Sequence, residues 1–274
     1  MQNEIKNFVL LKTFYSNVTS CMDDITSFSY RLSHDYPSLI ERWKHFAGIA
    51  DLNFREICIS EGIPVYGLLS ENKEKQNVYL SAGIHGDEPA GVWALLLWSE
   101  INKEFFKNYN FTIFPCLNPW GFIENNRLNS KGNDLNRSWD KNGEVRISEV
   151  IKRTKNKRFL LAVNLHEDYE ADGIYLYEPF TGKNRDEVAA KILKAGSKNI
   201  PIDSRKEIEG RLASNGVIRP VENDLPKEGL PEAAFLQRSR SERTFVFETP
   251  SEYDLKIRVQ AQVAMLERAA SEIL

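Results

Sequence analysis

The chain has 274 residues, a hydrophobic content of 42% and a formal net charge of −3. This length allows one large domain with a deep core, and the even mixture of acids and bases argues against nucleic acid as a partner. The apolar runs are too short to span a membrane, the N-terminus has no secretory signal, and the three widely spaced cysteines form no CxxC pair. We therefore expect a cytoplasmic protein with no membrane partner, disulfide framework or cysteine zinc cluster.

The first part of the chain predicts a helix, a pair of strands, and then a strand followed by a second helix. Apolar residues at helical spacing indicate a helix over 36–47. Residues 54–60 and 64–70 flank a short turn and are expected to pair as strands. Residues 77–84 predict the next strand. The segment 89–106 is apolar almost all round in its first half, which predicts a buried helix.

The alternation of strands and helices continues to the end of the chain. Strands are predicted over 111–117 and 158–165, and the second of these is nearly all apolar, as strands covered on both faces are. A helix over 185–196, a strand over 244–248 and an amphipathic helix over 254–274 follow. Buried strands that alternate with helices predict an α/β fold with helices on both faces of the sheet.

The domain organisation predicted from this pattern is a single domain. Residues 1–35 are interpreted as an N-terminal extension and residues 36–274 as the core, because no repeat, low-complexity tract or linker divides the chain. Residues 197–243 are irregular and rich in glycine, proline and charge. A long irregular stretch inside a compact domain favours a functional loop or lid.

Polar side chains follow four of the predicted strands. His85 and Glu88 follow the strand over 77–84, the polar loop 125–140 follows the next strand, His166 follows 158–165, and Glu248 ends the last strand. In an open α/β sheet, ligands bind beyond the carboxyl ends of the strands. We therefore expect these groups to converge on one site.

Two histidines and one carboxylate, with a fourth position open, are the ligand set of a catalytic zinc. We predict that His85, Glu88 and His166 bind one Zn²⁺ per chain, although cobalt or manganese would also suit these ligands. Glu248, beside the metal rather than on it, would take a proton from metal-activated water and pass it to the leaving nitrogen. Asp134 would accept the free ring N–H of His85 and fix its tautomer.

Each of these residues also has a simpler structural explanation. Glu88 could stabilise a helix N-terminus, His166 could be a surface histidine paired with neighbouring acids, and Arg137 could be an ordinary ion-pair partner. These residues stand at the ends of separate strands. One shared site explains all of them at once, so we prefer it to a separate structural explanation for each.

Five motifs occur here in an order that resembles the zinc carboxypeptidases of the M14 (carboxypeptidase A-like) family. They are GIHGDEPAG (83–91), NPWGF (118–122), RLNSKGNDLNRSWD (127–140), NLHED (164–168) and VFETP (246–250). The resemblance spans roughly residues 36–274. It implies a carboxypeptidase-like core with a mixed, mostly parallel eight-stranded sheet between helices.

The resemblance also implies roles for individual residues. His85, Glu88 and His166 match the family's zinc ligands, and Glu248 matches its general base. The remaining matches lie in one loop: Arg127 resembles the arginine that polarises the scissile carbonyl, Asn136 and Arg137 the pair that grips the substrate's free carboxylate, and Asp134 the acid behind the first histidine. One departure is that 178–247 contains no tyrosine, whereas larger family members close over substrate with a tyrosine there.

Three functions follow. The first is a zinc-dependent metallocarboxypeptidase that hydrolyses a C-terminal peptide bond, or an amide beside a free carboxylate, with a variant that cleaves a cell-wall tripeptide. The second is an N-acyl amino acid deacylase that resembles succinylglutamate desuccinylase and aspartoacylase. The third is a catalytically silent peptide-binding protein. Four arginines in or near 197–243 could select an acidic substrate, or could simply be solvated: Arg205, Arg211, Arg219 and Arg238.

Overall fold

The computed structural model describes residues 33–179 and 186–274. Nearly all of the N-terminal extension proposed for 1–35 lies outside these residues, as does Cys21. The two cysteines within them, Cys58 and Cys116, are free thiols. In the described part of the chain, no helix is both long and apolar enough to cross a membrane.

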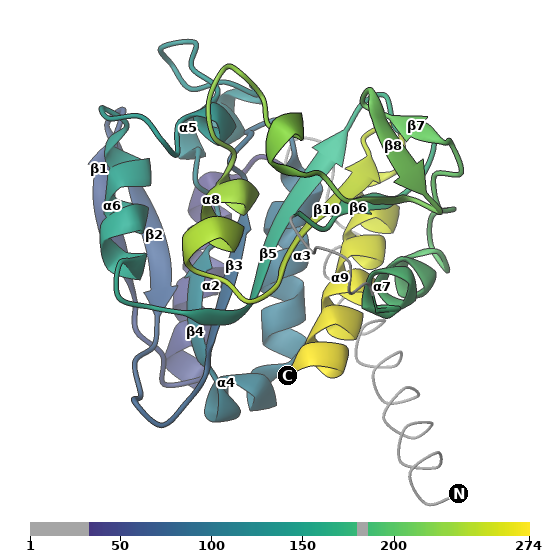
Figure 1. Ribbon diagram of the computed structural model, residues 1–274. Coiled ribbons are helices and arrows are strands. Elements are labelled where there is room, and N and C mark those ends of the chain that lie inside the picture. Colours follow the sequence, from purple (N-terminus) through teal and green to yellow (C-terminus); the bar gives the residue numbers. More distant parts are fainter. Residues whose placement is uncertain (1–32, 180–185) are drawn as a thin grey trace, which may run out of the picture.

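The described chain folds into a ten-stranded sheet with helices on both faces (Figure 1), which confirms the predicted fold class. The strands in chain order are β1 (Phe54–Ser60), β2 (Ile63–Leu69), β3 (Asn77–Ala82), β4 (Asn110–Phe114), β5 (Phe159–Asp168), β6 (Tyr175–Tyr177), β7 (Glu207–Ile208), β8 (Arg211–Ser214), β9 (Val217–Ile218) and β10 (Thr244–Pro250). Their order across the sheet is β1-β2-β4-β3-β5-β10-β6-β9-β8-β7.

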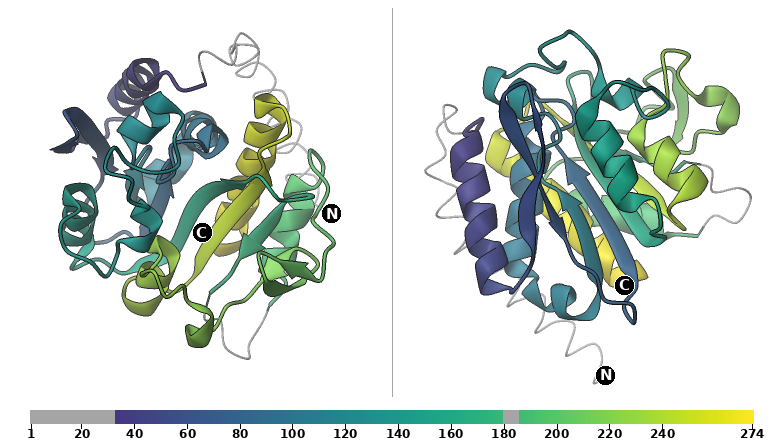
Figure 2. Two further views of the ribbon diagram at one scale, coloured as in Figure 1. Left: turned by 90° about the horizontal axis from the view of Figure 1, so that it is seen from above. Right: turned by 90° about the vertical axis from the view of Figure 1, so that its left-hand side faces the viewer.

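The helices divide between the two faces of the sheet. They are α2 (Tyr36–Ile49), α3 (Pro89–Ile101), α4 (Lys103–Asn108), α5 (Pro119–Glu124), α6 (Val145–Thr154), α7 (Val188–Gly196), α8 (Glu232–Ser239) and α9 (Leu255–Ile273). Side chains of α2, α3, α7 and α9 form one apolar core, and those of α6 and α8 belong to a second core on the opposite face. The two layers are visible from above in Figure 2.

The sheet has ten strands, so the expected count of eight is wrong. Three short strands that no sequence pattern indicated, β7, β8 and β9, lie within residues 207–218, a stretch predicted to be irregular. Strands of two to four residues are too short to show an alternating pattern. The predicted mostly parallel arrangement holds for the neighbouring strands β4, β3, β5 and β10, whereas five of the nine strand pairings are antiparallel.

The helix predicted over 89–106 is interrupted at Asn102, between α3 and α4. The Asn102 side-chain amide donates a hydrogen bond to the carbonyl of Trp98 at 3.0 Å, and the Asn102 backbone N–H bonds to the same carbonyl. Asparagine competes in this way with regular helical bonding. As predicted, α3 is buried almost all round.

One close contact joins α3 to β5 near the predicted site. A Cβ atom placed on Gly91 would lie 2.8 Å from the Cβ of Leu165. Any side chain at position 91 would therefore push the helix away from the strand. Glycine allows the start of α3, which follows Glu88, to lie against the end of β5, which carries His166.

Candidate metal centre

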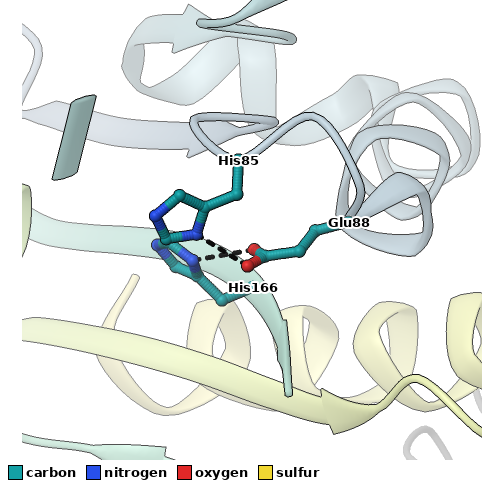
Figure 3. A group of neighbouring side chains, drawn as sticks. All are labelled: His85, Glu88 and His166. Carbon is teal, nitrogen blue, oxygen red and sulfur yellow. Dashed lines mark hydrogen bonds and ion pairs between the residues drawn. The ribbon is translucent and has the colours of Figure 1, made fainter. Parts of the chain in front are cut away.

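The predicted metal ligands lie at the carboxyl ends of neighbouring strands. His85 and Glu88 occupy the turn between β3 and α3, and His166 lies near the end of β5. Because β3 and β5 are parallel neighbours, their carboxyl ends meet at the same edge of the sheet. The structure therefore brings these three residues together, as Figure 3 shows.

The two imidazoles share one carboxylate. The Nδ1 atoms of His85 and His166 lie 2.6 Å and 2.9 Å from the two oxygens of Glu88. One ligand atom from each residue falls within 4.8 Å of the others, and all three side chains are buried. A tetrahedral zinc with bonds of about 2.0–2.1 Å separates its ligand atoms by about 3.3 Å, so the ion would fit after small shifts of these side chains.

The turn that carries His85 and Glu88, called the first ligand turn below, needs its glycines because of the way it packs. Gly83 has a φ of +61°, in the left-handed region that favours glycine. A Cβ on Gly86 would lie only 1.9 Å from the backbone carbonyl carbon of Gly121. The Gly86 N–H also donates to the carbonyl of Asn126 at 3.1 Å. This contact holds the ligand turn against the loop that carries Arg127.

Protonation in the metal-free cluster follows from burial and shared charge. Burial alone would lower the pKa of His85, but the Glu88 carboxylate and the hydrogen bond with Asp134 raise that pKa to about 9. Burial lowers the pKa of His166, which Glu88 only partly offsets. Burial would raise the pKa of Glu88, but the two histidines hold it well below its ordinary range. The carboxylate is thus ionised, as metal ligation requires.

Two further predicted residues contact this cluster. Asp134 Oδ1 lies 3.2 Å from His85 Nε2, the ring nitrogen that does not face Glu88. Arg127 Nη1 lies 3.2 Å from Glu88 Oε1, and its Nη2 lies 3.6 Å from Asp134 Oδ2. The Arg127 side chain is 44% exposed, so part of its guanidinium remains available to a ligand.

Asn136 and Arg137 lie in a short 3₁₀ turn (Leu135–Arg137) on the wall of the same cavity. Asn136 Oδ1 accepts a hydrogen bond from the backbone N–H of Glu232 at 2.9 Å, which fixes the side-chain amide. Arg137 Nη1 donates to the carbonyl of Asn136 at 2.8 Å. The loop predicted to hold positive charge therefore places two arginines beside the cluster.

Glu248 lies on β10, directly opposite His166 on the parallel strand β5. Residues in register on adjacent strands point their side chains to the same face, about 5 Å apart. The Glu248 residue is 8% exposed. Burial, and then repulsion from Glu88, Glu209 and Asp168, raise its pKa well above the usual range. A cation among the three ligands would oppose this repulsion from Glu88.

The cluster opens into a cavity of about 300 Å³. Residues that the sequence analysis did not single out line part of its wall, among them Tyr177 and Glu209, and the Tyr177 hydroxyl donates a hydrogen bond to Glu209. Tyr177 lies one residue before the tyrosine-free segment 178–247. Glu209 reaches the cavity from the turn between β7 and β8, which no sequence pattern indicated.

Of the four arginines considered for substrate selection, only Arg211 lines this cavity among the described residues. The other three form ion pairs: Arg205 with Asp203 and Asp172, Arg219 with Glu178, and Arg238 with Glu222. The structure therefore favours the solvated or ion-paired explanation for those three.

Residues 74–176 match the family described as the succinylglutamate desuccinylase/aspartoacylase catalytic domain. This segment includes His85, Glu88 and His166 and ends before Glu248. No curated protein matches the chain.

Solved structures share the fold over most of the chain. A proposed metallopeptidase of Shewanella denitrificans OS217 is 21% identical, with a TM-score of 0.78 over 88% of this chain and 91% of that one. A proposed metallopeptidase of Shewanella amazonensis SB2B is 24% identical, with a TM-score of 0.76 over 88% and 94%. Carboxypeptidase A of Helicoverpa armigera is 13% identical, with a TM-score of 0.64 over 96% and 80%.

Together these likenesses confirm the relationship predicted from the motifs. The chain has the fold of the carboxypeptidase A-like metallopeptidases, and a segment of it matches the catalytic domain of the succinylglutamate desuccinylase/aspartoacylase group.

Proposed function

We propose that the protein is a zinc-dependent hydrolase that cleaves an amide bond next to a free carboxylate, acting as a metallocarboxypeptidase. The observation that carries the proposal is the placement of Glu248 beside the His85–Glu88–His166 cluster, in the cavity that Arg127 and Arg137 also line. A buried carboxylate, three converging candidate ligands and two cations that face one cavity support a catalytic role better than a purely structural one.

The donor set fits zinc. Two imidazole nitrogens and one carboxylate, with Asp134 holding the outer ring nitrogen of His85, are typical of catalytic zinc sites. A zinc ion bound there would polarise the scissile carbonyl and lower the pKa of a water molecule.

The side chains around the cluster would supply the remaining chemistry. Glu248 would accept a proton from the attacking water and donate it to the leaving nitrogen. Arg127 would stabilise the negative charge that develops on the carbonyl oxygen. Arg137, with Asn136, would bind the free carboxylate of the substrate through charge-assisted hydrogen bonds. Anchoring that carboxylate would confine cleavage to the end of a peptide.

The match of residues 74–176 favours a second candidate, an N-acyl amino acid deacylase. Both reactions break an amide beside a carboxylate, so they require the same central residues. The native enzyme assayed with short peptides and with N-acyl amino acids, at equal zinc, would separate them. We expect higher kcat/KM for peptides, and the reverse order would establish the deacylase. Zinc binding with no hydrolysis of either class would favour the silent peptide-binding protein.

Substitution of Glu248 tests the proposed base. Glu248→Gln keeps the shape of the side chain but cannot accept the proton, so kcat should fall by about 10²–10⁴-fold. Because Glu248 is not among the metal ligands, zinc content should stay at one ion per chain. Full activity in this variant would eliminate the assignment.

Substitution of Arg137 tests the proposed carboxylate anchor. Loss of one charge-assisted contact should lower kcat/KM about 10–100-fold for a peptide with a free C-terminus. The same peptide with an amidated C-terminus should be a poor substrate for both enzymes, with no further loss in Arg137→Ala. Arg158→Ala is the control, since Arg158 is 71% exposed and pairs with Glu242 on the surface. An equal loss on both peptides would show that Arg137 does not bind the carboxylate.

A further inference from the structure

Glu88 occupies the N-cap position of α3, yet its side chain makes no capping hydrogen bond. Its carboxylate faces His85 and His166 instead. The first N–H groups of a helix have no partner within the helix and need one from elsewhere. A residue that serves as a metal ligand at this position therefore leaves the helix end without its usual acceptor.

The missing acceptor comes from the neighbouring strand. Glu167 Oε1 accepts a hydrogen bond from the Ala90 backbone N–H at 2.6 Å. Ala90 lies two residues after Glu88, and Glu167 directly follows His166. Side chains alternate between the two faces along β5, so Glu167 points away from the face that carries His166 and toward α3 and α9. The Glu167 side chain is fully buried.

The C-terminal helix completes this arrangement. Arg258 of α9 pairs with the second carboxylate oxygen of Glu167. One helical turn later, Gln262 donates hydrogen bonds to the carbonyl of His166 at 2.8 Å and to Thr249 Oγ1 at 2.9 Å. Three elements, β5, α3 and α9, thus meet at polar contacts directly behind the metal ligands.

A buried ion pair is weak evidence for stability, because apolar side chains of similar volume often stabilise a core equally well. The Glu167–Arg258 pair lies directly behind the candidate metal ligands, and this location suggests a role other than stability. One carboxylate oxygen of Glu167 fixes the backbone at the start of α3. The backbone of Glu167 directly follows that of His166. The carboxylate therefore joins the two backbone segments that carry Glu88 and His166.

We propose that Glu167 is a positioning residue of the metal centre: it caps α3 in place of Glu88 and so holds the Glu88 carboxylate at ligand distance from His166. The inference rests on the proposed metal centre and does not depend on which amide bond is cleaved.

The zinc dissociation constant, measured by competition with a chromophoric chelator, tests this role in three variants. Glu167→Ala removes the acceptor and should weaken zinc binding about 10–100-fold. Glu167→Gln keeps an oxygen at the same reach and should stay within about threefold of the native constant. Glu167→Asp keeps the charge opposite Arg258 but withdraws it by about one carbon–carbon bond, about 1.5 Å, and should weaken binding more than Gln does.

Glu178 provides the matched control. It is also a buried carboxylate, and it pairs with Arg219 and Arg243 at 2.8 Å and 2.5 Å. Glu178→Ala should lower the unfolding temperature of the metal-free protein, as Glu167→Ala should, but leave the zinc dissociation constant unchanged. The absorption spectrum of bound Co²⁺ should change in Glu167→Ala and Glu167→Asp alone.

The outcomes separate the two proposals. Native zinc affinity in Glu167→Ala would overturn the positioning role while leaving the metal centre intact. Native zinc affinity in Glu167→Asp together with weak binding in Glu167→Gln would do the same. If Glu167→Ala does not fold, the relative zinc affinities of Glu167→Gln and Glu167→Asp decide whether Glu167 has the positioning role. A native protein that binds no zinc would overturn the proposed function and this inference with it.

Discussion

At the scale of single residues, Glu232 is a buried acid that the proposed reaction does not use. It begins α8, is 1% exposed, and accepts a hydrogen bond from the Tyr79 hydroxyl. Burial raises its pKa from 4.5 to about 7, although hydrogen bonds with Tyr79 and Ser81 oppose the shift. Since the folded state binds this proton more tightly than the unfolded chain, Glu232 makes stability depend on pH.

The direction of that dependence follows from the two pKa values. Below pH 4.5 the carboxyl is protonated in both states, and it contributes no pH dependence. Between pH 4.5 and about 7 the unfolded chain ionises first, so the free energy of unfolding falls as pH rises. Above pH 7 the loss is complete, at roughly 3 kcal/mol.

Glu232→Gln should remove this loss, because an amide does not ionise. The gain in unfolding free energy relative to the native protein should be larger at pH 8 than at pH 4, by roughly 3 kcal/mol. Urea denaturation of both proteins at several pH values measures it. A difference between variant and native protein that does not change with pH would show that Glu232 has the same pKa in the folded and unfolded states.

The sequence predicted the residues that directly follow long strands. His85, Glu88 and His166 stand beside apolar runs whose ends must meet in a parallel sheet, and the structure brings these three candidates together. Tyr177 and Glu209 could not be found in this way, because β6 and β7 are too short to show a pattern. Glu209 reaches the cavity only through the order β6-β9-β8-β7, which no local pattern encodes.

At the scale of elements, the first ligand turn, which carries His85 and Glu88, packs closely against α5. A Cβ on Gly86 would lie 1.9 Å from the Gly121 carbonyl carbon and 2.3 Å from the Phe122 nitrogen. Both neighbours are backbone atoms and cannot move away as a flexible side chain can. Gly86→Ala should therefore displace the turn from the loop that carries Arg127.

We expect Gly86→Ala to destabilise the fold by about 1–3 kcal/mol or more and to weaken zinc binding. Thermal unfolding and zinc titration measure the two effects. Gly48→Ala is the control: a Cβ there has open space, so the change should be neutral or slightly stabilising. Equal behaviour of the two variants would show that the turn is not constrained by α5.

Element prediction succeeded where the hydrophobic pattern was long. The helices α2, α3 and α9 and the strands β3 and β5 all lie close to their predicted positions. The helices α5, α6 and α8, with six, ten and eight residues, were not predicted. The break at Asn102 coincides with a side-chain hydrogen bond to Trp98, which an apolar pattern does not encode.

At the scale of the whole molecule, the fold assembles the site from distant parts of the chain. The strands β3, β5 and β10 are neighbours in the sheet, although β3 and β10 lie more than 160 residues apart in sequence. Helices on both faces bury these strands (Figures 1 and 2), and the candidate metal ligands lie at the carboxyl ends of β3 and β5. The order of the motifs predicted that these strand ends converge. The distances between the side chains could be obtained only from the structure.

The metal itself is the most direct test of this account. Crystals of the protein grown with zinc, with data collected on both sides of the zinc absorption edge, would locate the ion by anomalous scattering. We expect a single strong peak about 2.0–2.2 Å from His85 Nδ1, His166 Nδ1 and a Glu88 oxygen. The absence of a peak between these three side chains, or a zinc ion bound elsewhere in the protein, would contradict the proposed metal centre.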